Sequence, residues 1–293
     1  MAYDYRWVLC STVNRVLTIT LNRPEAINAL NRDLEGDLHA ALDEGDVDPD
    51  VRVMVITGSG RGFSAGYDMA GGPGQKSRLD PSGFASVSDF IAANAKLDYQ
   101  NMHRAQLHLL RLNKPVIAAV HGYCMGGGMW LAMACDMTYC AEDAVFGQPE
   151  VRHGSNSTFL IPALCGWKHA SRYLLTGDHL DGKEAARIGL VNECLAREEL
   201  MPTVQHVAER VAKVPPDSVR HMKRLIMSGF LAYGLSDAME LCAAMSALLH
   251  TSHGPERQAM FDAQAERGFR GFLEVRDGPF FPEAMGPKSR AGR

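Results

Sequence analysis

Two glycine-rich turns carry the residue types that could perform chemistry. Residues 55–68 (VITGSGRGFSAGYD) and 118–132 (AAVHGYCMGGGMWLA) each begin with an apolar run and pass into a glycine cluster. Glycine lets a ligand approach the backbone closely, and a helix that begins after residues 126–128 would present unpaired N–H groups and the positive end of its dipole. Together the two turns could stabilise an anion. The alternative is that each cluster only turns a tight corner between a strand and a helix.

Two other kinds of site also use glycine-rich turns. A nucleotide site needs G-x-G-x-x-G at the start of a helix or G-x-x-x-x-G-K-[ST], and neither pattern occurs. Residues 62–66 (GFSAG) do match the G-x-S-x-G motif of serine hydrolases, with Ser64 as nucleophile. In that motif a strand runs directly into the serine and a helix leaves it, whereas residues 67–73 (YDMAGGP) cannot start a good helix. A serine hydrolase that uses Ser64 stays as an alternative.

The N-terminal part of the chain predicts a hairpin, a helix and a strand in that order. Residues 8–19 alternate in polarity around a tip at Asn14-Arg15. Residues 28–42 predict a helix with Asn31 as its N-cap, since Leu34, Leu38 and Leu42 share one face. Residues 51–57 (VRVMVIT) then predict a buried strand that ends at the first glycine cluster.

Between and after the two turns the same alternation continues. Residues 71–88 are rich in Gly, Pro and Ser and predict a loop, and residues 89–112 predict a helix. Residues 116–120 predict a second buried strand, which the glycines connect to a helix over 129–134. Strands that alternate with helices imply crossover units and therefore an α/β fold.

The C-terminal third has a different composition. Residues 200–214 and 216–230 predict amphipathic helices, and residues 237–249 are rich in Ala, Met and Leu on several faces. A helix that is apolar on several faces needs cover, for which another subunit is the candidate. We therefore divide the chain into a core, residues 1–198, and a C-terminal helical region, residues 199–293.

Composition excludes several classes of protein. The chain has 293 residues, with 30 basic and 34 acidic side chains, so it lacks the basic excess of a nucleic-acid binder. Its apolar runs are far shorter than the roughly 18 residues of a membrane span, and its N-terminus has no targeting pattern. Seven cysteines without C-x-x-C and eleven histidines without H-x-x-x-H predict neither disulfides nor a metal site. We expect a cytoplasmic protein with no membrane or nucleic-acid partner.

An ordered set of motifs resembles the crotonase family, also called the enoyl-CoA hydratase/isomerase superfamily. The resemblance runs from Leu21 to about Cys194 and rests on LNRPEAINAL (21–30), FSAGYD (63–68), the segment 122–136, FGQPE (146–150), LTGD (175–178) and the segment 185–192. It implies a spiral of ββα units that holds CoA and the active site, followed by a helical region that builds homotrimers, often paired into hexamers. It also implies an acyl-CoA thioester as substrate, with no metal and no cofactor beyond the CoA of that substrate.

Carried over residue by residue, the resemblance assigns roles in the site. The backbone N–H groups of Tyr67 and Gly127 would form an oxyanion hole for the thioester oxygen. An enolate passes its charge to that oxygen, and each preorganised donor is worth roughly 2.7–4 kcal/mol. Glu150 would be the general acid/base. The backbone at Ala65 would meet the adenine of CoA.

Two departures from the family pattern bear on the reaction. The second glutamate of the hydratases falls at Trp130, which cannot transfer a proton, and we interpret Trp130 as a wall of the acyl pocket. The loop after Glu150, residues 151–162, also differs, and His153 is its candidate for a replacement acid/base or a substrate contact. The resemblance also places Asp68 beside the substrate. We expect the Asp68 side chain to hold a loop in place and not to take part in the reaction.

The sequence therefore predicts a carbon–oxygen lyase that adds water to a 2-enoyl-CoA, with Glu150, Tyr67 and Gly127 as the catalytic groups. Double-bond isomerisation, retro-aldol cleavage and ring C–C hydrolysis use the same enolate and stay open. From other classes, a non-catalytic acyl-CoA binding protein and the serine hydrolase also stay open.

Overall fold

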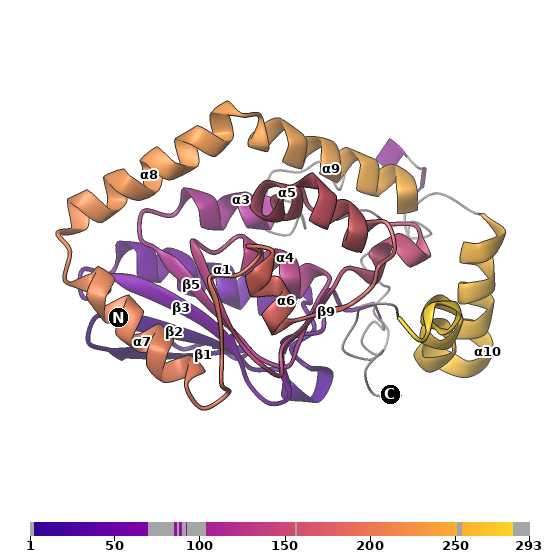
Figure 1. Cartoon of the computed structure of the whole chain (residues 1–293), viewed down its shortest axis with the longest axis horizontal. Helices are drawn as coiled ribbons and strands as arrows, with labels where there is room; N and C mark the ends of the chain where they lie inside the picture. Colours follow the sequence, from indigo (N-terminus) through magenta and orange to yellow (C-terminus); the bar gives the residue numbers. More distant parts are fainter. Residues whose placement is uncertain are drawn as a thin grey trace.

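The structure is a computed structural model of the whole chain, and it describes residues 3–69, 85–86, 88–89, 92, 104–155, 157–250 and 254–283. Most of the predicted loop over 71–88, and residues 90–91 and 93–103 of the predicted helix over 89–112, lie outside these residues. Figure 1 shows a sheet-containing body, with long helices of the C-terminal region along one edge and at one end.

Two sheets form the body. The main sheet has the order β1-β2-β3-β5-β7-β10, in which only β1 is antiparallel to its neighbour. Its strands are β1 (Val8–Val13), β2 (Val16–Leu21), β3 (Val53–Gly58), β5 (Val116–Val120), β7 (Met137–Ala141) and β10 (Glu193–Leu195). The smaller sheet has the order β4-β6-β8-β9, made of β4 (Gly62–Ser64), β6 (Tyr123–Met125), β8 (Val145–Gly147) and the antiparallel β9 (Leu180–Asp181).

The two sheets are linked by a repeated step. Each of β3, β5 and β7 in the main sheet is followed directly by a short strand, β4, β6 or β8, in the smaller sheet. A helix follows β6 and another follows β8. This repetition is the spiral of ββα units that the resemblance implied, and the α/β class is confirmed.

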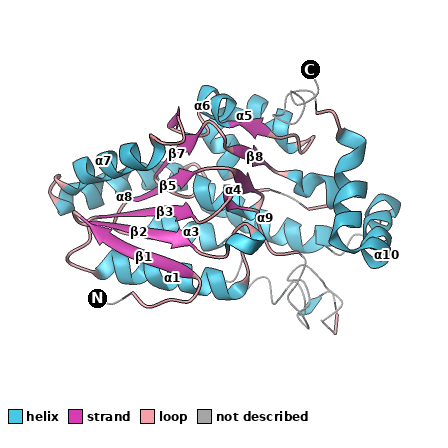
Figure 2. Cartoon of the chain, turned by 90° about the horizontal axis from the view of Figure 1, so that it is seen from below, coloured by secondary structure: helices cyan, strands magenta, loops and turns pink. Residues whose placement is uncertain are grey.

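Helices cover both faces of the main sheet. The helices are α1 (Arg32–Val47), α3 (Arg104–Arg111), α4 (Gly127–Met133), α5 (Leu160–Leu174), α6 (Gly182–Arg187), α7 (Leu200–Ala212), α8 (Pro216–Ala232), α9 (Leu235–His250) and α10 (Pro255–Asp277). Because side chains alternate along a strand, Met54 and Ile56 of β3 join the core on the α1 side, whereas Val53 and Val55 pack with α7. Figure 2 shows α1 and α7 on opposite faces. The first helix of the predicted C-terminal region thus packs on the core sheet.

The N-terminal predictions are confirmed, with one difference. Asn14 and Arg15 form the hairpin tip, both with positive φ, and the Asn31 side chain accepts a hydrogen bond from the Leu34 N–H at 2.9 Å as an N-cap. The helix begins at Arg32 and not at residue 28. The reason is Asn28, which has φ 51° and whose buried side-chain amide donates to the carbonyls of Ser59 and Gly62 at 2.9 Å each. It therefore holds the first glycine turn in place.

The C-terminal helices extend beyond the body. In Figure 1, α8 and α9 form a long arm along its upper edge. Lys223 of α8 anchors this arm, since its ammonium lies 2.7 Å from Asp136, which also accepts from the Val116 N–H. Within the described residues no single helix is long and apolar enough to cross a membrane; α8 with α9 as far as Ser246 passes that test only as a pair bent by 61°.

The periodicity of the sequence did not predict α5 or α10. Each is interrupted by a glycine in the left-handed region, Gly166 with φ 73° and Gly268 with φ 69°. Such a break shifts the phase of the apolar stripe, and this weakens the periodic pattern by which a helix is recognised in sequence. The omission matters because α10 covers one side of the candidate site.

Candidate active site

A cavity of about 390 Å³ opens where the two glycine turns, a short 3-10 helix and α10 meet. The 3-10 helix is η3 (Pro149–His153). Six of the seven predicted site residues line this cavity: Ala65, Tyr67, Asp68, Trp130, Glu150 and His153. The seventh, Gly127, borders a smaller void of about 20 Å³ that also touches Tyr67 and Trp130. Three segments far apart in the sequence are thus brought to one place.

The two glycine turns lie against each other. Tyr67 forms an isolated parallel bridge with Leu30, in which the Leu30 N–H donates to the Gly66 carbonyl and the Asp68 N–H donates to the Leu30 carbonyl. The Tyr67 N–H takes no part in that bridge. Gly127 is the first residue of α4, where N–H groups have no acceptor within the helix. A Cβ atom on Gly127 would overlap the Tyr67 ring, so glycine is required for this close approach.

Glu150 is the acid/base candidate that the cavity contains. Its Oε2 atom is buried and has no hydrogen-bond partner among the described residues. Burial raises the pKa of Glu150 to about 7, although a backbone hydrogen bond and the charge of Arg276 lower it in part. Gly126 has φ 50°, and a Cβ atom there would overlap Oε1 of Glu150. The second glycine turn therefore makes room for this carboxyl group, which can exchange a proton near neutral pH.

Trp130 is held as a fixed wall. Its indole Nε1–H donates to Oε1 of Gln148 at 2.6 Å, and the Ser157 hydroxyl donates to the same oxygen at 2.7 Å. The Gln148 amide in turn donates to the Gly126 carbonyl at 3.2 Å. The Trp130 ring meets the Tyr67 ring edge to face, with centroids 5.8 Å apart. Since the polar atom of the indole is already engaged, the ring presents carbon to the cavity.

His153 lines the same wall of the cavity as Glu150, but its side chain has different surroundings. Side chains three residues apart eclipse in a 3-10 helix, so both line the cavity. The His153 ring packs edge to face on Phe272 of α10, and both of its ring nitrogens are buried from solvent. The geometry favours a packing role for His153 over proton transfer to a water molecule in the cavity.

Asp68 and Ser64 are both occupied by local structure. An oxygen of Asp68 lies 2.6 Å from Nη1 of Arg23, which also donates to the Ala29 carbonyl, so the pair ties the first glycine turn to the segment before α1. Ser64 is fully buried; its hydroxyl donates to the Asn28 carbonyl at 2.8 Å and accepts from the Gly66 N–H at 3.2 Å. A nucleophile must be reachable, and the burial of Ser64 argues against the serine hydrolase.

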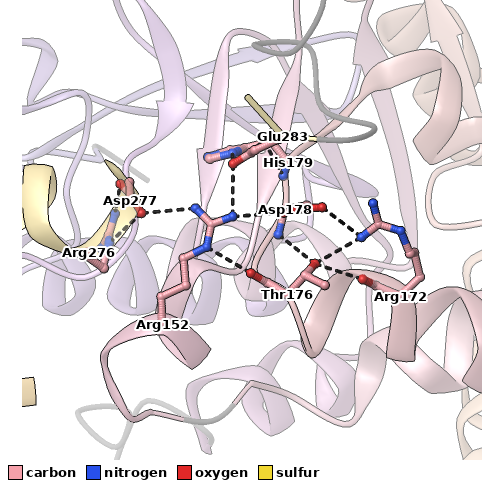
Figure 3. Close-up of polar contacts among 8 residues, drawn as sticks. All are labelled: Arg152, Arg172, Thr176, Asp178, His179, Arg276, Asp277 and Glu283. Carbon is pink, nitrogen blue, oxygen red and sulfur yellow. Dashed lines mark hydrogen bonds and ion pairs between the residues drawn. The ribbon is translucent and has the colours of Figure 1, made fainter. Parts of the chain in front are cut away.

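The contribution of α10 and of a buried ionic cluster was not predicted from the sequence. Phe269, Leu273 and Arg276 of α10 line the cavity. Behind them, Arg152 of η3 contacts three carboxylates, those of Asp178, Asp277 and Glu283, at 3.1–3.2 Å (Figure 3). Glu283 is buried, yet hydrogen bonds from His179 and Arg152 outweigh that effect and lower its pKa to about 2. The one available signal was Arg152 itself, an arginine two residues after the candidate acid/base.

Comparison with known proteins identifies the family of the chain. The family model for enoyl-CoA hydratase/isomerase matches residues 11–281, nearly the whole chain. The chain belongs to the enoyl-CoA hydratase/isomerase family. The resemblance found in the sequence is confirmed.

Relatives of this family match over most of their length. A probable enoyl-CoA hydratase of Mycobacterium bovis is 31% identical over 282 residues, which are 93% of this chain and 96% of that protein. A crotonyl-CoA hydratase of Syntrophomonas wolfei is 34% identical over 235 residues, 78% of this chain and 84% of the relative. A crystal structure of an enoyl-CoA hydratase/isomerase from Xanthobacter autotrophicus superposes with a TM-score of 0.84 at 29% identity, covering 94% of this chain and 99% of the other.

Proposed function

We propose that the protein adds water to the double bond of a 2-enoyl-CoA thioester. The observation that carries this proposal is the carboxyl group of Glu150, which shares one cavity with the two glycine turns and has a pKa of about 7. The names of the hydratase relatives support the same reaction.

The substrate binds with its thioester oxygen at the junction of the turns. The backbone N–H groups of Tyr67 and Gly127 donate to this oxygen, and Ala65 offers its backbone to the adenine of CoA. The donors stabilise the enolate that forms during the reaction, at roughly 2.7–4 kcal/mol for each one. CoA enters as part of the substrate, and the residues of the cavity need no further cofactor for this chemistry.

One carboxyl group suffices for hydration. Ionised Glu150 accepts a proton from water while the water oxygen bonds to Cβ of the substrate, and the double-bond electrons move to the thioester oxygen. The enolate then takes the proton from Glu150 at Cα, which restores the carboxylate. Trp130 stands where a second carboxyl would act, so it bounds the acyl group and carries no proton.

Double-bond isomerisation is the second candidate, because a single proton carrier is enough for it. Glu150 would remove a proton from one carbon and return it to another, without water. The indole N–H of Trp130 is already hydrogen-bonded to Gln148, so Trp130 is not a second proton carrier. This observation supports isomerisation as much as it supports hydration by a single carboxyl group.

Heavy-oxygen water distinguishes the two. The purified protein is incubated with a panel of enoyl-CoA thioesters, including ring-bearing ones, in H₂¹⁸O and analysed by mass spectrometry. Hydration predicts a product heavier by one labelled water with the thioester intact. Ring opening with uptake of water would indicate C–C hydrolysis, and an unchanged mass with a moved double bond would indicate isomerisation. No reaction with any thioester that binds would favour a non-catalytic binding protein.

We also propose a cytoplasmic homotrimer or hexamer that assembles through α8 and α9. Support comes from apolar side chains on this arm that are largely exposed in the single chain, among them Leu225 at 67%, Tyr233 at 92% and Leu241 at 61%. Contiguous exposed apolar surface usually marks an interface. Light scattering coupled to gel filtration tests the assembly, and a monomeric mass would refute it.

A further inference from the structure

Arg276 places an incompletely paired guanidinium in the wall of the cavity. The residue is 8% exposed and lines the same cavity as Glu150. Its Nε and Nη2 atoms donate to the two oxygens of Asp277 at 3.0 and 2.9 Å. Nη1 has no hydrogen-bond partner among the described residues. Nη1 is not one of the buried unpaired side-chain atoms of the described residues, so it is open at the cavity, where it can donate to a ligand.

Asp277 is the ion-pair partner of Arg276. Asp277 also accepts a hydrogen bond from Nη1 of Arg152 at 3.2 Å, and Arg152 in turn contacts Asp178 and Glu283 (Figure 3). The acidic groups of the described lining are Asp68, which is paired with Arg23, and Glu150, which is partly protonated near pH 7. Arg276 is the one arginine or lysine in that lining. The Nη1 edge of Arg276 is therefore the point of that lining at which an anionic group can be bound.

The position of Arg276 relates it to the acyl group. Asp277 links Arg276 to Arg152 of η3, the element that also holds Glu150, and the charge of Arg276 acts on the Glu150 carboxyl. Glu150 acts at Cα and Cβ of the substrate under the proposed function. Apolar side chains, including Met125, Trp130 and Leu273, line the cavity around these groups and suit a hydrocarbon segment.

Resting on the proposed function, we propose that the acyl group carries a second carboxylate, which Arg276 binds through Nη1. The substrate class is a 2-enoyl-CoA that ends in a carboxylate instead of a methyl group. The phosphates of CoA are the other anions such a guanidinium could meet. They are common to all acyl-CoA substrates, so a comparison between two acyl groups separates the two sources.

The test compares matched thioesters. For each of several chain lengths, kcat/KM is measured for a methyl-ended and a carboxylate-ended 2-enoyl-CoA. Charge-assisted hydrogen bonds predict that the protein prefers the carboxylate-ended member by about 10- to 100-fold at the best length. Arg276→Gln is expected to remove this preference for the carboxylate-ended substrate. An effect of the variant on the Glu150 pKa slows both substrates equally and cancels in the ratio.

Arg267→Gln is the control, since Arg267 lies on the same helix, is half exposed and pairs with Glu274. It should leave the ratio unchanged. Arg276→Lys keeps the charge and should retain part of the ratio, and thermal unfolding of each variant verifies folding. No preference in the unsubstituted protein, or an equal loss for both substrates in Arg276→Gln, would overturn the inference.

Binding of saturated analogues separates this inference from the proposed function. Calorimetry with the saturated methyl-ended and carboxylate-ended thioesters needs no turnover. A preference of about tenfold for the carboxylate that disappears in Arg276→Gln supports the inference even if no water is added to any enoyl-CoA. Water addition without any carboxylate preference supports the function and refutes the inference.

Discussion

Two buried ionisable side chains of η3, Arg152 and Glu150, differ in their hydrogen-bond partners. Arg152 is fully buried as a side chain, and its guanidinium donates to the Thr176 carbonyl at 2.9 Å and to three carboxylates. Glu150, two residues earlier, has an oxygen buried without a hydrogen-bond partner among the described residues. The chain thus gives each nitrogen of Arg152 a partner and leaves one oxygen of Glu150 without one.

This difference separates stability from chemistry. A buried charge that is fully hydrogen-bonded keeps its ionised form and fixes the elements that supply its partners, here η3, the segment 176–178, the end of α10 and Glu283. A buried carboxyl with one oxygen that lacks a partner has its charged form destabilised by burial, so its pKa rises to a value suited to proton transfer at neutral pH. The fixed end of η3 holds the reactive end at the cavity.

The largest effect is expected from a change at Glu150. Glu150→Gln keeps the shape and removes the proton carrier, so kcat should fall by about 10³-fold, within the range for general acid/base groups. Binding of a saturated acyl-CoA, measured by calorimetry, should be retained. Glu142→Gln is the matched control, because Glu142 is exposed and pairs with Lys183 at the surface. Turnover that survives in Glu150→Gln would mean that another group carries the proton.

Next in size is a change at the satisfied end. Arg152→Met leaves Asp178, Asp277 and Glu283 with one cation fewer, and removing one member of a buried ionic cluster costs about 3–5 kcal/mol. Urea unfolding should show this loss. Arg172→Met, a control that also removes a partner of Asp178 but from a one-third exposed side chain, should cost less than about 1 kcal/mol. Equal losses would show that burial of Arg152 contributes nothing special.

A smaller effect is expected from the glycine that makes room for Glu150. Gly126→Ala should displace the carboxyl, since the new Cβ overlaps Oε1, and lower kcat by about 10- to 100-fold, as misplaced catalytic groups do. Gly166→Ala is a control with the same left-handed strain, at φ 73°, and open space around it. If both variants lose only stability, the close contact has no catalytic meaning.

The smallest effect is a pair of opposite pH dependences of stability. Because the pKa of Glu150 is higher in the folded state than in the unfolded chain, Glu150 contributes to stability at pH values below the unfolded pKa near 4.5. This contribution is lost as pH rises through about 7. The lowered pKa of Glu283 stabilises the folded state above 4.5, and this is lost as pH falls through about 2. Glu150→Gln should remove the first pH dependence and Glu283→Gln the second. Each change should alter the free energy of unfolding by roughly 1 kcal/mol or more in unfolding titrations, since one pKa unit corresponds to 1.36 kcal/mol. The same slope in a variant and in the unsubstituted protein would refute the assignment.

Local patterns sufficed for much of the fold. The hairpin tip at Asn14-Arg15, the N-cap Asn31 and the strand over 116–120 depend on turn chemistry, capping and short-range alternation, and all three are confirmed. The start of the first helix was misplaced because Asn28 bonds to carbonyls 31 and 34 residues away. No local pattern encodes such partners.

For the site, the sequence by itself determined the residue types: two glycine turns, one carboxyl at position 150, and an indole where a proton carrier would otherwise stand. Only the tertiary structure decided their states. It engaged the Trp130 N–H with Gln148, buried the His153 nitrogens, hid Ser64 and brought Arg276 of an unpredicted helix to the cavity. The physical reason is that pKa and reactivity depend on burial and on partners from distant segments, and these exist only once the chain has packed.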